Sequence, residues 1–257
     1  MPGSDLSLLI DAAQEAGRIA CGFAGKNPEV WDKADGAGPV TEADLAVNRM
    51  LDAELRAARP DYGWLSEESP QDDARLNDER VFIIDPIDGT RSFIAGDSTW
   101  AHSLAIAEKG KVTAAVVYLP LRDKLYTAEL GHGAHLNGDV IAVGSRPDLT
   151  GADILATKPA MDAKNWHALP DVKRNHRPSL AYRLSLVAEG KFDAMFTFRP
   201  TWEWDVAAGD LILQEAGAIT SDRHGAPLIF NNKDPRLAGM IGANATLHQS
   251  ISDALVY

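Results

Sequence analysis

The chain has 257 residues, enough for one large domain or two closely joined ones, and its 45% hydrophobic content is ordinary for a globular protein. Its 37 acidic side chains outnumber the 25 basic ones and give a formal net charge of −12. This sign disfavours polymeric nucleic acid and anionic membranes as partners, because both require a basic surface. A surplus of carboxylates does suit divalent cations.

Cysteine content and the N-terminal sequence bear on the compartment. Cys21 is the only cysteine, so the chain can form neither an internal disulfide nor a thiolate metal cluster. The first residues lack a basic segment followed by a long apolar stretch, and no window reaches about 18 uninterrupted apolar residues. We therefore expect a cytoplasmic protein that does not enter a membrane.

Two helices are predicted in the first 60 residues. Apolar or small residues recur at helical spacing from Ser4, a candidate N-cap, to Gly25, a candidate stop. Thr41 and Asp44 have the form of a capping box, and the apolar pattern that follows them ends at Pro60. A helix pair is therefore expected to open the fold.

The rest of the chain changes from β-rich to alternating. Four β-rich runs separated by turn sequences predict an antiparallel meander over residues 81–84, 103–107, 112–119 and 125–128. Beyond residue 150 we expect strands near 154–156, 194–198, 218–221 and 239–242, with helices near 179–189 and 205–216. These patterns predict an N-terminal α+β domain over residues 1–145 and a C-terminal α/β domain over residues 146–257.

The most informative motif is the segment 85–90, with the sequence DPIDGT, which follows an apolar strand. Pro86 cannot donate a backbone hydrogen bond and favours an extended Asp85, so the chain must turn there. Asp85 and Asp88 would repel each other in such a turn unless a cation lay between them, and Mg²⁺ prefers carboxylate oxygens. The residues alone leave a second interpretation open, an Asx-type turn with solvated acids.

Other acidic positions are less specific when each is taken alone. Glu67 and Glu68 are neighbours, and neighbours on an extended segment point to opposite sides, so only one of them is expected at a given site. Asp205 begins a predicted helix whose first turn is small, and an N-cap role would also explain it. Asp44 is likewise explained by its capping box.

Taken in order, these segments resemble the inositol monophosphatase superfamily of metal-dependent, lithium-sensitive phosphatases. The resemblance spans nearly the whole chain and rests on Lys33, residues 40–44, 67–68, 85–90, 204–209 and 214–217. It implies a five-layer αβαβα sandwich, with a helix pair on an antiparallel sheet and a smaller C-terminal α/β half. This agrees with the predicted elements.

The resemblance also implies a site and a reaction. Two or three Mg²⁺ ions would be held by Glu67, Asp85, the Ile87 carbonyl, Asp88 and Asp205. The phosphate would be bound by Ile87, Asp88, Gly89 and Thr90 at the start of a short helix. Thr90, supported by Asp44 and together with Glu67, would orient a metal-activated water for attack on a phosphomonoester. Most metal ligands would thus lie in residues 1–145, with Asp205 and substrate contacts in residues 146–257.

The expected substrate follows from a closer resemblance within the superfamily. Residues 179–190 and 200–205 are similar to the 3′(2′),5′-bisphosphate nucleotidase branch, and Phe198 stands where inositol-specific members carry a glutamate. The substrate contacts expected from this are Arg183, Glu203 and Asp205. We therefore expect hydrolysis of adenosine 3′,5′-bisphosphate to AMP. Inositol 1-phosphate, or another sugar, polyol or histidinol phosphate, is the alternative.

Other classes of protein fit the residues less well. A haloacid-dehalogenase-type phosphatase needs D-x-D-x-T with a nucleophilic first aspartate, whereas the spacing here is D-x-x-D-G-T. A non-catalytic metal- or phosphate-binding module would be expected to lack a ligand or Thr90, and none is missing. The basic residues Lys173, Arg174, His176 and Arg177 are interpreted as a solvated loop, with attraction of a polyanionic substrate as the alternative. Homodimers are common in the superfamily, and the sequence leaves the oligomeric state open.

Overall fold

The computed structural model describes residues 3–26, 28–33 and 38–256. Its α-helices are α1 Asp5–Phe23, α2 Glu42–Ala58, α3 Thr90–Ile94, α4 Leu180–Ala188, α5 Glu203–Glu215 and α6 Ala245–Ala254. The strands of its larger sheet are β3 Gly63–Ser66, β4 Arg80–Asp88, β5 Ala101–Glu108, β6 Lys111–Leu119, β7 Lys124–Glu129, β8 Ala134–Leu136 and β9 Asp139–Val140. The remaining strands are β1 Val30–Asp32, β2 Pro39–Thr41, β10 Asp153–Leu155, β11 Lys173–Asn175, β12 Ala194–Thr197, β13 Thr201–Trp202, β14 Ile219–Ser221, β15 Arg236–Leu237 and β16 Met240–Ala243.

The predicted helix pair is confirmed, with the predicted caps. The Ser4 side chain accepts a hydrogen bond from the Ser7 amide at the start of α1. Both hydrogen bonds of the capping box between Thr41 and Asp44 are present at the start of α2. The buried faces of the two helices pack on the sheet through small and aliphatic side chains, including Leu9, Ala13, Val47 and Leu51. Local hydrogen bonding and apolar periodicity therefore suffice to explain these two elements.

The predicted antiparallel meander is also confirmed and forms the centre of a larger sheet. The strand order is β3-β4-β5-β6-β7-β8-β9, and β3 pairs parallel to β4 while the other pairs are antiparallel. Strands β3, β8 and β9 were not predicted, because they are short and lie at or next to an edge of the sheet. The long central strands are buried on both faces, so they appear as nearly continuous apolar runs.

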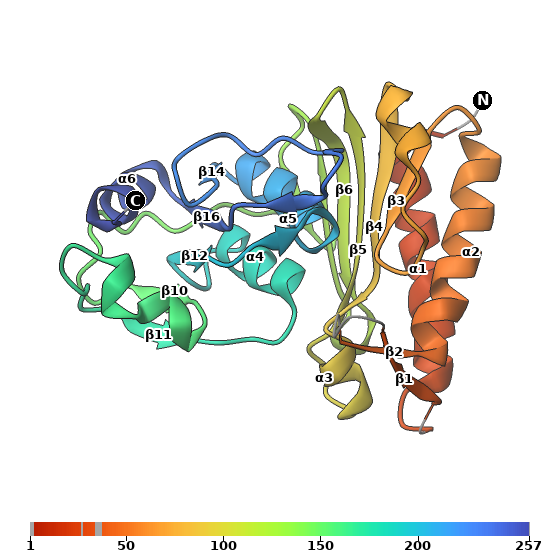
Figure 1. Cartoon of the computed structure of the whole chain (residues 1–257), viewed down its shortest axis with the longest axis horizontal. Helices are drawn as coiled ribbons and strands as arrows, with labels where there is room; N and C mark the ends of the chain where they lie inside the picture. The colour runs from red at the N-terminus through yellow and green to blue at the C-terminus, as the bar shows by residue number, and fades with distance from the viewer. Residues whose placement is uncertain (1–2, 27, 34–37, 257) are drawn as a thin grey trace.

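The second half builds a smaller sheet in the order β11-β10-β12-β16-β14, with parallel and antiparallel pairs. Figure 1 shows α4 and α5 between the two sheets, α1 and α2 on the outer face of the larger sheet, and α6 at the far side of the smaller one. The order of layers is therefore αβαβα, as expected. The sequence analysis missed α6 and several two- or three-residue strands.

Close approach of α4 and α5 explains the small residues of α5. A Cβ atom at Gly209 would lie 2.4 Å from Leu184 Cδ1, so only glycine fits at this crossing. Ala207 and Ala208 are fully buried beside it. The small side chains were expected to admit a close neighbour, and here that neighbour is helix α4. This packing brings the first turn of α5 to the larger sheet.

The proposed division of the chain between residues 145 and 146 falls between β9 and β10. One continuous apolar cluster joins residues on both sides of it, including Ala115 and Val117 of β6 with Leu184 and Leu211 of the second half. The two-domain division remains a prediction. Within the described ranges, no helix combines the length and the apolar character needed to cross a bilayer.

Candidate metal centre and active site

Strand β4 delivers two aspartates to one end of the larger sheet. Asp85 pairs with Ser103 and Asp88 pairs with Ala101, and the register shifts between these two pairs at Pro86. The Asp85 Oδ1 atom accepts a hydrogen bond of 3.0 Å from the Ile87 amide, so the Asx-type turn is present. However, Asp85 and Asp88 are only 1% and 7% exposed. The interpretation of this turn as a solvated loop is therefore wrong.

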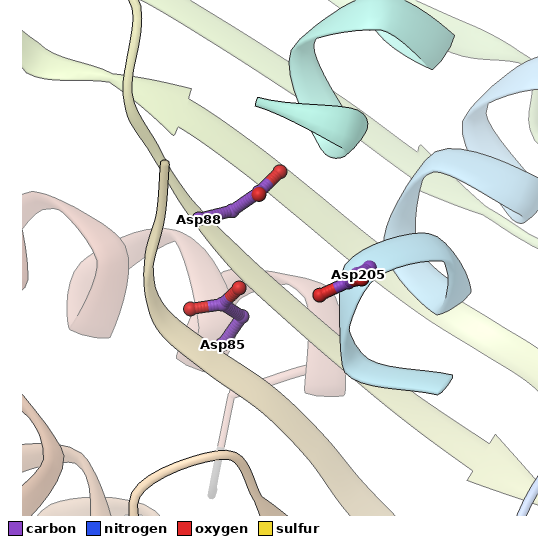
Figure 2. Close-up of side chains that lie close together, drawn as sticks. All are labelled: Asp85, Asp88 and Asp205. Carbon is purple, nitrogen blue, oxygen red and sulfur yellow. The ribbon is translucent and has the colours of Figure 1, made fainter. Parts of the chain in front are cut away.

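A third carboxylate reaches the same place from helix α5. Carboxylate oxygens of Asp85, Asp88 and Asp205 all lie within 4.8 Å of one another. Figure 2 shows the three side chains converging, two from the C-terminal end of β4 and one from the first turn of α5. Asp205 is not the N-cap of this helix, because Trp202 occupies that position and Asp205 is the third helical residue. Its side chain is therefore free of the capping role that the sequence also allowed.

Burial and mutual repulsion dominate the electrostatics of this cluster. Burial, followed by the charges of Glu67, Asp88 and Asp205, raises the pKa of Asp85 well above its ordinary value. Burial and then Asp88 and Glu67 raise the pKa of Asp205 in the same way. Burial also raises the pKa of Asp88 to about 6, although hydrogen bonds from Ser179 and Ala181 oppose the shift. The ionised cluster thus needs positive charge.

Asp88 is held by the second half of the chain. Its Oδ2 atom accepts hydrogen bonds of 2.6 Å from the Ser179 hydroxyl and 2.6 Å from the Ala181 amide, at the start of α4. Ser179 also caps α4 by accepting from the Tyr182 amide. The sequence analysis placed Ser179 at a helix start and missed its bond to Asp88. Ser179 and Asp88 are 91 positions apart in the sequence, so no local pattern indicates the hydrogen bond between them.

Glu67 and Glu68 share one cation. Lys33 Nζ lies 2.6 Å from Glu67 Oε1 and 2.6 Å from Glu68 Oε1. Strand β3 ends at Ser66, so the two glutamates occupy a turn, and the expectation that they point to opposite sides is wrong. Glu67, but not Glu68, lines the cavity that contains the three aspartates. Burial lowers the pKa of Lys33, but the two glutamates outweigh this and raise it.

Thr90 and Asp44 are in contact, as the resemblance implies. Thr90 Oγ1 lies 3.2 Å from Asp44 Oδ1 and 3.2 Å from the Ile87 carbonyl oxygen. The Thr41 amide donates a hydrogen bond of 2.9 Å to Asp44 Oδ2 as part of the capping box. One carboxylate therefore serves as helix cap and as partner of Thr90. Gly89, with φ of 103°, makes the left-handed turn that places Thr90 at the start of α3.

The cluster forms one side of a cavity of about 480 Å³. The same cavity is also lined by two cationic side chains, Arg183 and Arg199, and by His176. His176 belongs to the basic segment that was interpreted as a solvated loop, and its Nε2 atom lies 2.9 Å from Arg183 Nη2. Burial, followed by the charge of Arg183, lowers the pKa of His176. The position of His176 in the cavity fits the alternative interpretation of the basic segment, whereas Arg199 was not predicted, because nothing local separates it from a surface cation.

Arg183 and Glu203, two of the expected substrate contacts, differ in their placement. Arg183 lines the cavity and is held by the Arg177 carbonyl, to which its Nε atom donates. Glu203 is fully buried outside the cavity, and its carboxylate accepts from the amides of Asn231 and Asn232 at 2.6 and 2.9 Å. This corrects the expected role of Glu203, because these buried hydrogen bonds leave its carboxylate no route to a substrate.

The raised carboxyl pKa values predict how the metal-free protein responds to pH. In the unfolded chain these carboxyl groups have pKa values near 4, and in the folded protein the pKa values are raised, to about 6 for Asp88. At a pH between the two, the native state binds more protons than the unfolded chain. The extra protons stabilise the folded protein. This stabilisation is complete below pH 4 and is lost as pH rises through the pKa values of the folded state. In EDTA, the unfolding free energy of Asp205→Asn should exceed that of wild type. We expect this difference to grow by about 1–3 kcal/mol from pH 5 to pH 8.

Urea denaturation at the two pH values measures this change, and the difference between the variants cancels groups outside the cluster. In the wild type, saturating Mg²⁺ should abolish the decrease in unfolding free energy between pH 5 and pH 8. An advantage of Asp205→Asn that is equal at both pH values would contradict the expected repulsion among the three aspartates.

The fold and this cluster together define a class of layered α/β proteins with a carboxylate site suited to hard divalent cations. The model of the inositol monophosphatase family matches residues 4–255, and the chain belongs to that family. Members of this family are phosphoric monoester hydrolases that use Mg²⁺.

Named relatives agree with this assignment. The inositol-1-monophosphatase of Rhizobium meliloti is 35% identical over 230 residues, covering 86% of each chain. The Nus factor SuhB of Escherichia coli K12 is 33% identical over 274 residues, covering 97% of this chain and 98% of the relative. The solved extragenic suppressor protein suhB of Bartonella henselae is 30% identical with a TM-score of 0.83, and 96% of each chain is covered. The IMPase of Thermotoga maritima is 28% identical with a TM-score of 0.81, covering 96% of this chain and 95% of that one.

These relatives bear on the expected branch of the family. They carry the names inositol-1-monophosphatase, SuhB and IMPase, and none of these four is named a 3′(2′),5′-bisphosphate nucleotidase. The nucleotidase prediction is therefore unsupported, and its alternative fits the relatives better. The structure also offers Trp202 no free face for a base, because it stacks on Trp204 at 4.8 Å and contacts Arg236.

Proposed function

We propose that this protein hydrolyses the phosphate monoester of a small polyol, with inositol 1-phosphate as the leading substrate, using Mg²⁺ held by Asp85, Asp88 and Asp205. The observation that carries the proposal is the convergence of three carboxylates within 4.8 Å, those of Asp85 and Asp88 buried and that of Asp205 partly exposed, in a cavity that also contains Thr90. Glu67 and the Ile87 carbonyl line the same cavity and complete the proposed ligand set.

The donor set fits Mg²⁺. All the proposed ligands are hard oxygens, and a surplus of buried negative charge makes this site far more favourable with a divalent cation than without one. Several oxygens at one cavity allow two or three ions, as the family resemblance implies. When bound, Mg²⁺ supplies positive charge that stabilises the transferring phosphoryl group and makes water more acidic.

The chain's own residues orient the reactants. Thr90 Oγ1 donates a hydrogen bond to Asp44 Oδ1 or to the Ile87 carbonyl, which leaves its lone pairs to accept a hydrogen bond from the attacking water and so to orient it. Asp44 is fixed by the cap of α2, so this arrangement does not depend on a mobile side chain. Gly89 lets the backbone of the turn approach the phosphate closely, because it has no Cβ.

The cationic side of the cavity supports an anionic substrate. Arg183 is 4% exposed, and its Nη1 atom has no hydrogen-bond partner among the residues that the structure describes. Arg183 lines the cavity together with Arg199, His176 and the three aspartates. This arrangement favours a second candidate, an ester with a further anionic group such as adenosine 3′,5′-bisphosphate, as the secondary substrate.

Phosphate release with and without EDTA tests both candidates. The substrates are inositol 1-phosphate, adenosine 3′,5′-bisphosphate, fructose 1,6-bisphosphate, histidinol phosphate and NADP. We expect the highest kcat/KM for inositol 1-phosphate and complete loss of turnover in EDTA. A higher value for the nucleotide would make the bisphosphate nucleotidase the main function, and no turnover of any substrate with Mg²⁺ would favour a binding module.

A further inference from the structure

A buried polar network links the first turn of α5 to the first half of the chain. Glu203 is 0% exposed, and Arg75, in the 3₁₀-helix Asp73–Asn77 between β3 and β4, is 3% exposed. Asn231 and Asn232 lie between these two buried charges and contact both of them. The network thus reaches from the element that precedes β4, the strand of Asp85, to the helix of Asp205.

Each charged group in this network is held by several bonds. Glu203 accepts from the Asn231 amide at 2.6 Å, the Asn232 amide at 2.9 Å and Asn232 Nδ2 at 2.7 Å. Arg75 donates to Asn231 Oδ1 and, at 2.9 Å, to the Asn232 carbonyl, while Asn231 Nδ2 donates back to the Arg75 carbonyl at 3.0 Å. Asn231 adopts a left-handed conformation with φ of 64°, which presents consecutive amides to Glu203.

The start of α5 has two further attachments. The Glu203 amide donates to the Pro235 carbonyl at 2.9 Å, and the Ser103 hydroxyl donates to the Trp204 carbonyl at 2.9 Å. Ser103 is itself the pairing partner of Asp85. The residues immediately before Asp205 are therefore tied to the sheet and to the segment 231–235, two positions from the carboxylate that completes the cluster.

A buried network of this kind determines geometry more than stability. Burying Arg75 and Glu203 carries a desolvation penalty that their bonds largely offset, so well-packed apolar side chains would serve stability as well. Directional bonds instead restrict the helix end to one position. Partners outside the immediate ligand shell commonly tune metal affinity in this way.

We propose that Glu203 and Arg75 are positioning residues that hold Asp205 at the distance from Asp85 and Asp88 that Mg²⁺ requires. This inference rests on the proposed function, since it presupposes that these three aspartates bind the metal. None of the four residues of this network lines the cavity.

Mg²⁺ titration by calorimetry and by the Mg²⁺-induced increase in Tm tests the proposal without using activity. In the wild type, the Glu203 carboxylate accepts hydrogen bonds from the backbone N–H groups of Asn231 and Asn232. In Glu203→Gln, the side-chain NH2 group would face one of these donors and could not accept its hydrogen bond. We expect its Mg²⁺ dissociation constant to rise about 10- to 100-fold. Its kcat at saturating Mg²⁺ should return to within about threefold of wild type with KM unchanged, because all the proposed ligands remain.

The matched control is Glu189→Gln, which alters a buried glutamate paired with Lys124 at the far end of α4. This variant should leave Mg²⁺ affinity within about twofold of wild type.

Arg75→Met should weaken Mg²⁺ binding as much as Glu203→Gln, and combining the two substitutions should weaken it little further. If Glu203→Gln does not fold, Asn232→Ala, which removes one side-chain donor, takes its place. Unchanged Mg²⁺ affinity in a folded variant overturns the positioning role, whereas no Mg²⁺ binding by the wild type overturns the metal site itself.

Discussion

Replacing Asp205 with asparagine is expected to lower kcat by more than about 100-fold, since loss of an outer partner of a metal site already costs 10- to 100-fold. The variant should also lose most of the heat of Mg²⁺ binding, because one of three converging carboxylates is gone. Its stability in EDTA should be equal to or higher than that of wild type, since substitution removes a charge whose burial raises its pKa. Phosphate release, calorimetry and thermal unfolding measure these three quantities.

Asp210→Asn is the matched control for this substitution. Asp210 lies on the same helix and is buried, but it is outside the cavity, and its Oδ2 atom accepts a hydrogen bond from Gln214 that asparagine can still accept. Its kcat should remain within about threefold of wild type. Asp205 is a cleaner choice than Asp88, whose carboxylate also accepts bonds from α4. Full activity in Asp205→Asn, or loss of folding, would indicate that Asp205 does not hold a metal.

Replacing Thr90 with valine is expected to lower kcat by about 100- to 10,000-fold, the usual contribution of a positioned acid–base group. Valine has nearly the same shape and is also β-branched, so the start of α3 should be preserved. The variant loses the hydroxyl that lies 3.2 Å from Asp44 Oδ1, and with it the group proposed to orient water. Mg²⁺ affinity should change little, because the three aspartates remain in place.

Thr90→Ser is the control, since serine keeps the hydroxyl and should retain activity within about tenfold. Stopped assays at saturating Mg²⁺ and substrate separate the effect on kcat from effects on binding. If Thr90→Val turned over at the rate of Thr90→Ser, water would be oriented by another group. A parallel loss of Mg²⁺ binding in Thr90→Val would instead indicate a damaged site.

Several local features of the fold could be predicted from the sequence. The capping box at Thr41 and Asp44 and the apolar periodicity of α1 and α2 involve residues within a few positions of one another, so their pattern is visible in the chain. The irregularity at Pro86 follows from the geometry of proline, but the predicted end of the strand there is wrong, because β4 continues to Asp88 with only a shift of register. The short strands β3, β8 and β9 could not be predicted because they gain their stability from pairing with distant partners.

The candidate site could be predicted in part. The DPIDGT segment and Asp205 stood out by residue type and by resemblance, and the structure brings their carboxylates together. The roles of Ser179, His176 and Arg199 had no local signal, because a serine at a helix start and cations in a loop are common on protein surfaces. Glu203 was assigned to the substrate by resemblance. Its true partners lie near residue 231, too far along the chain to leave a local signal.

By itself the sequence determined most of the longer helices and strands and the residue types available for chemistry, because capping and apolar periodicity act over short distances along the chain. Only the tertiary structure decided which carboxylates share a site. Asp88 and Asp205 are separated by more than a hundred residues, and they meet because Gly209 lets α5 cross α4 closely beneath the larger sheet. Burial in that layer also decided their electrostatics, since the same aspartates in water would keep ordinary pKa values and would have little need of a cation.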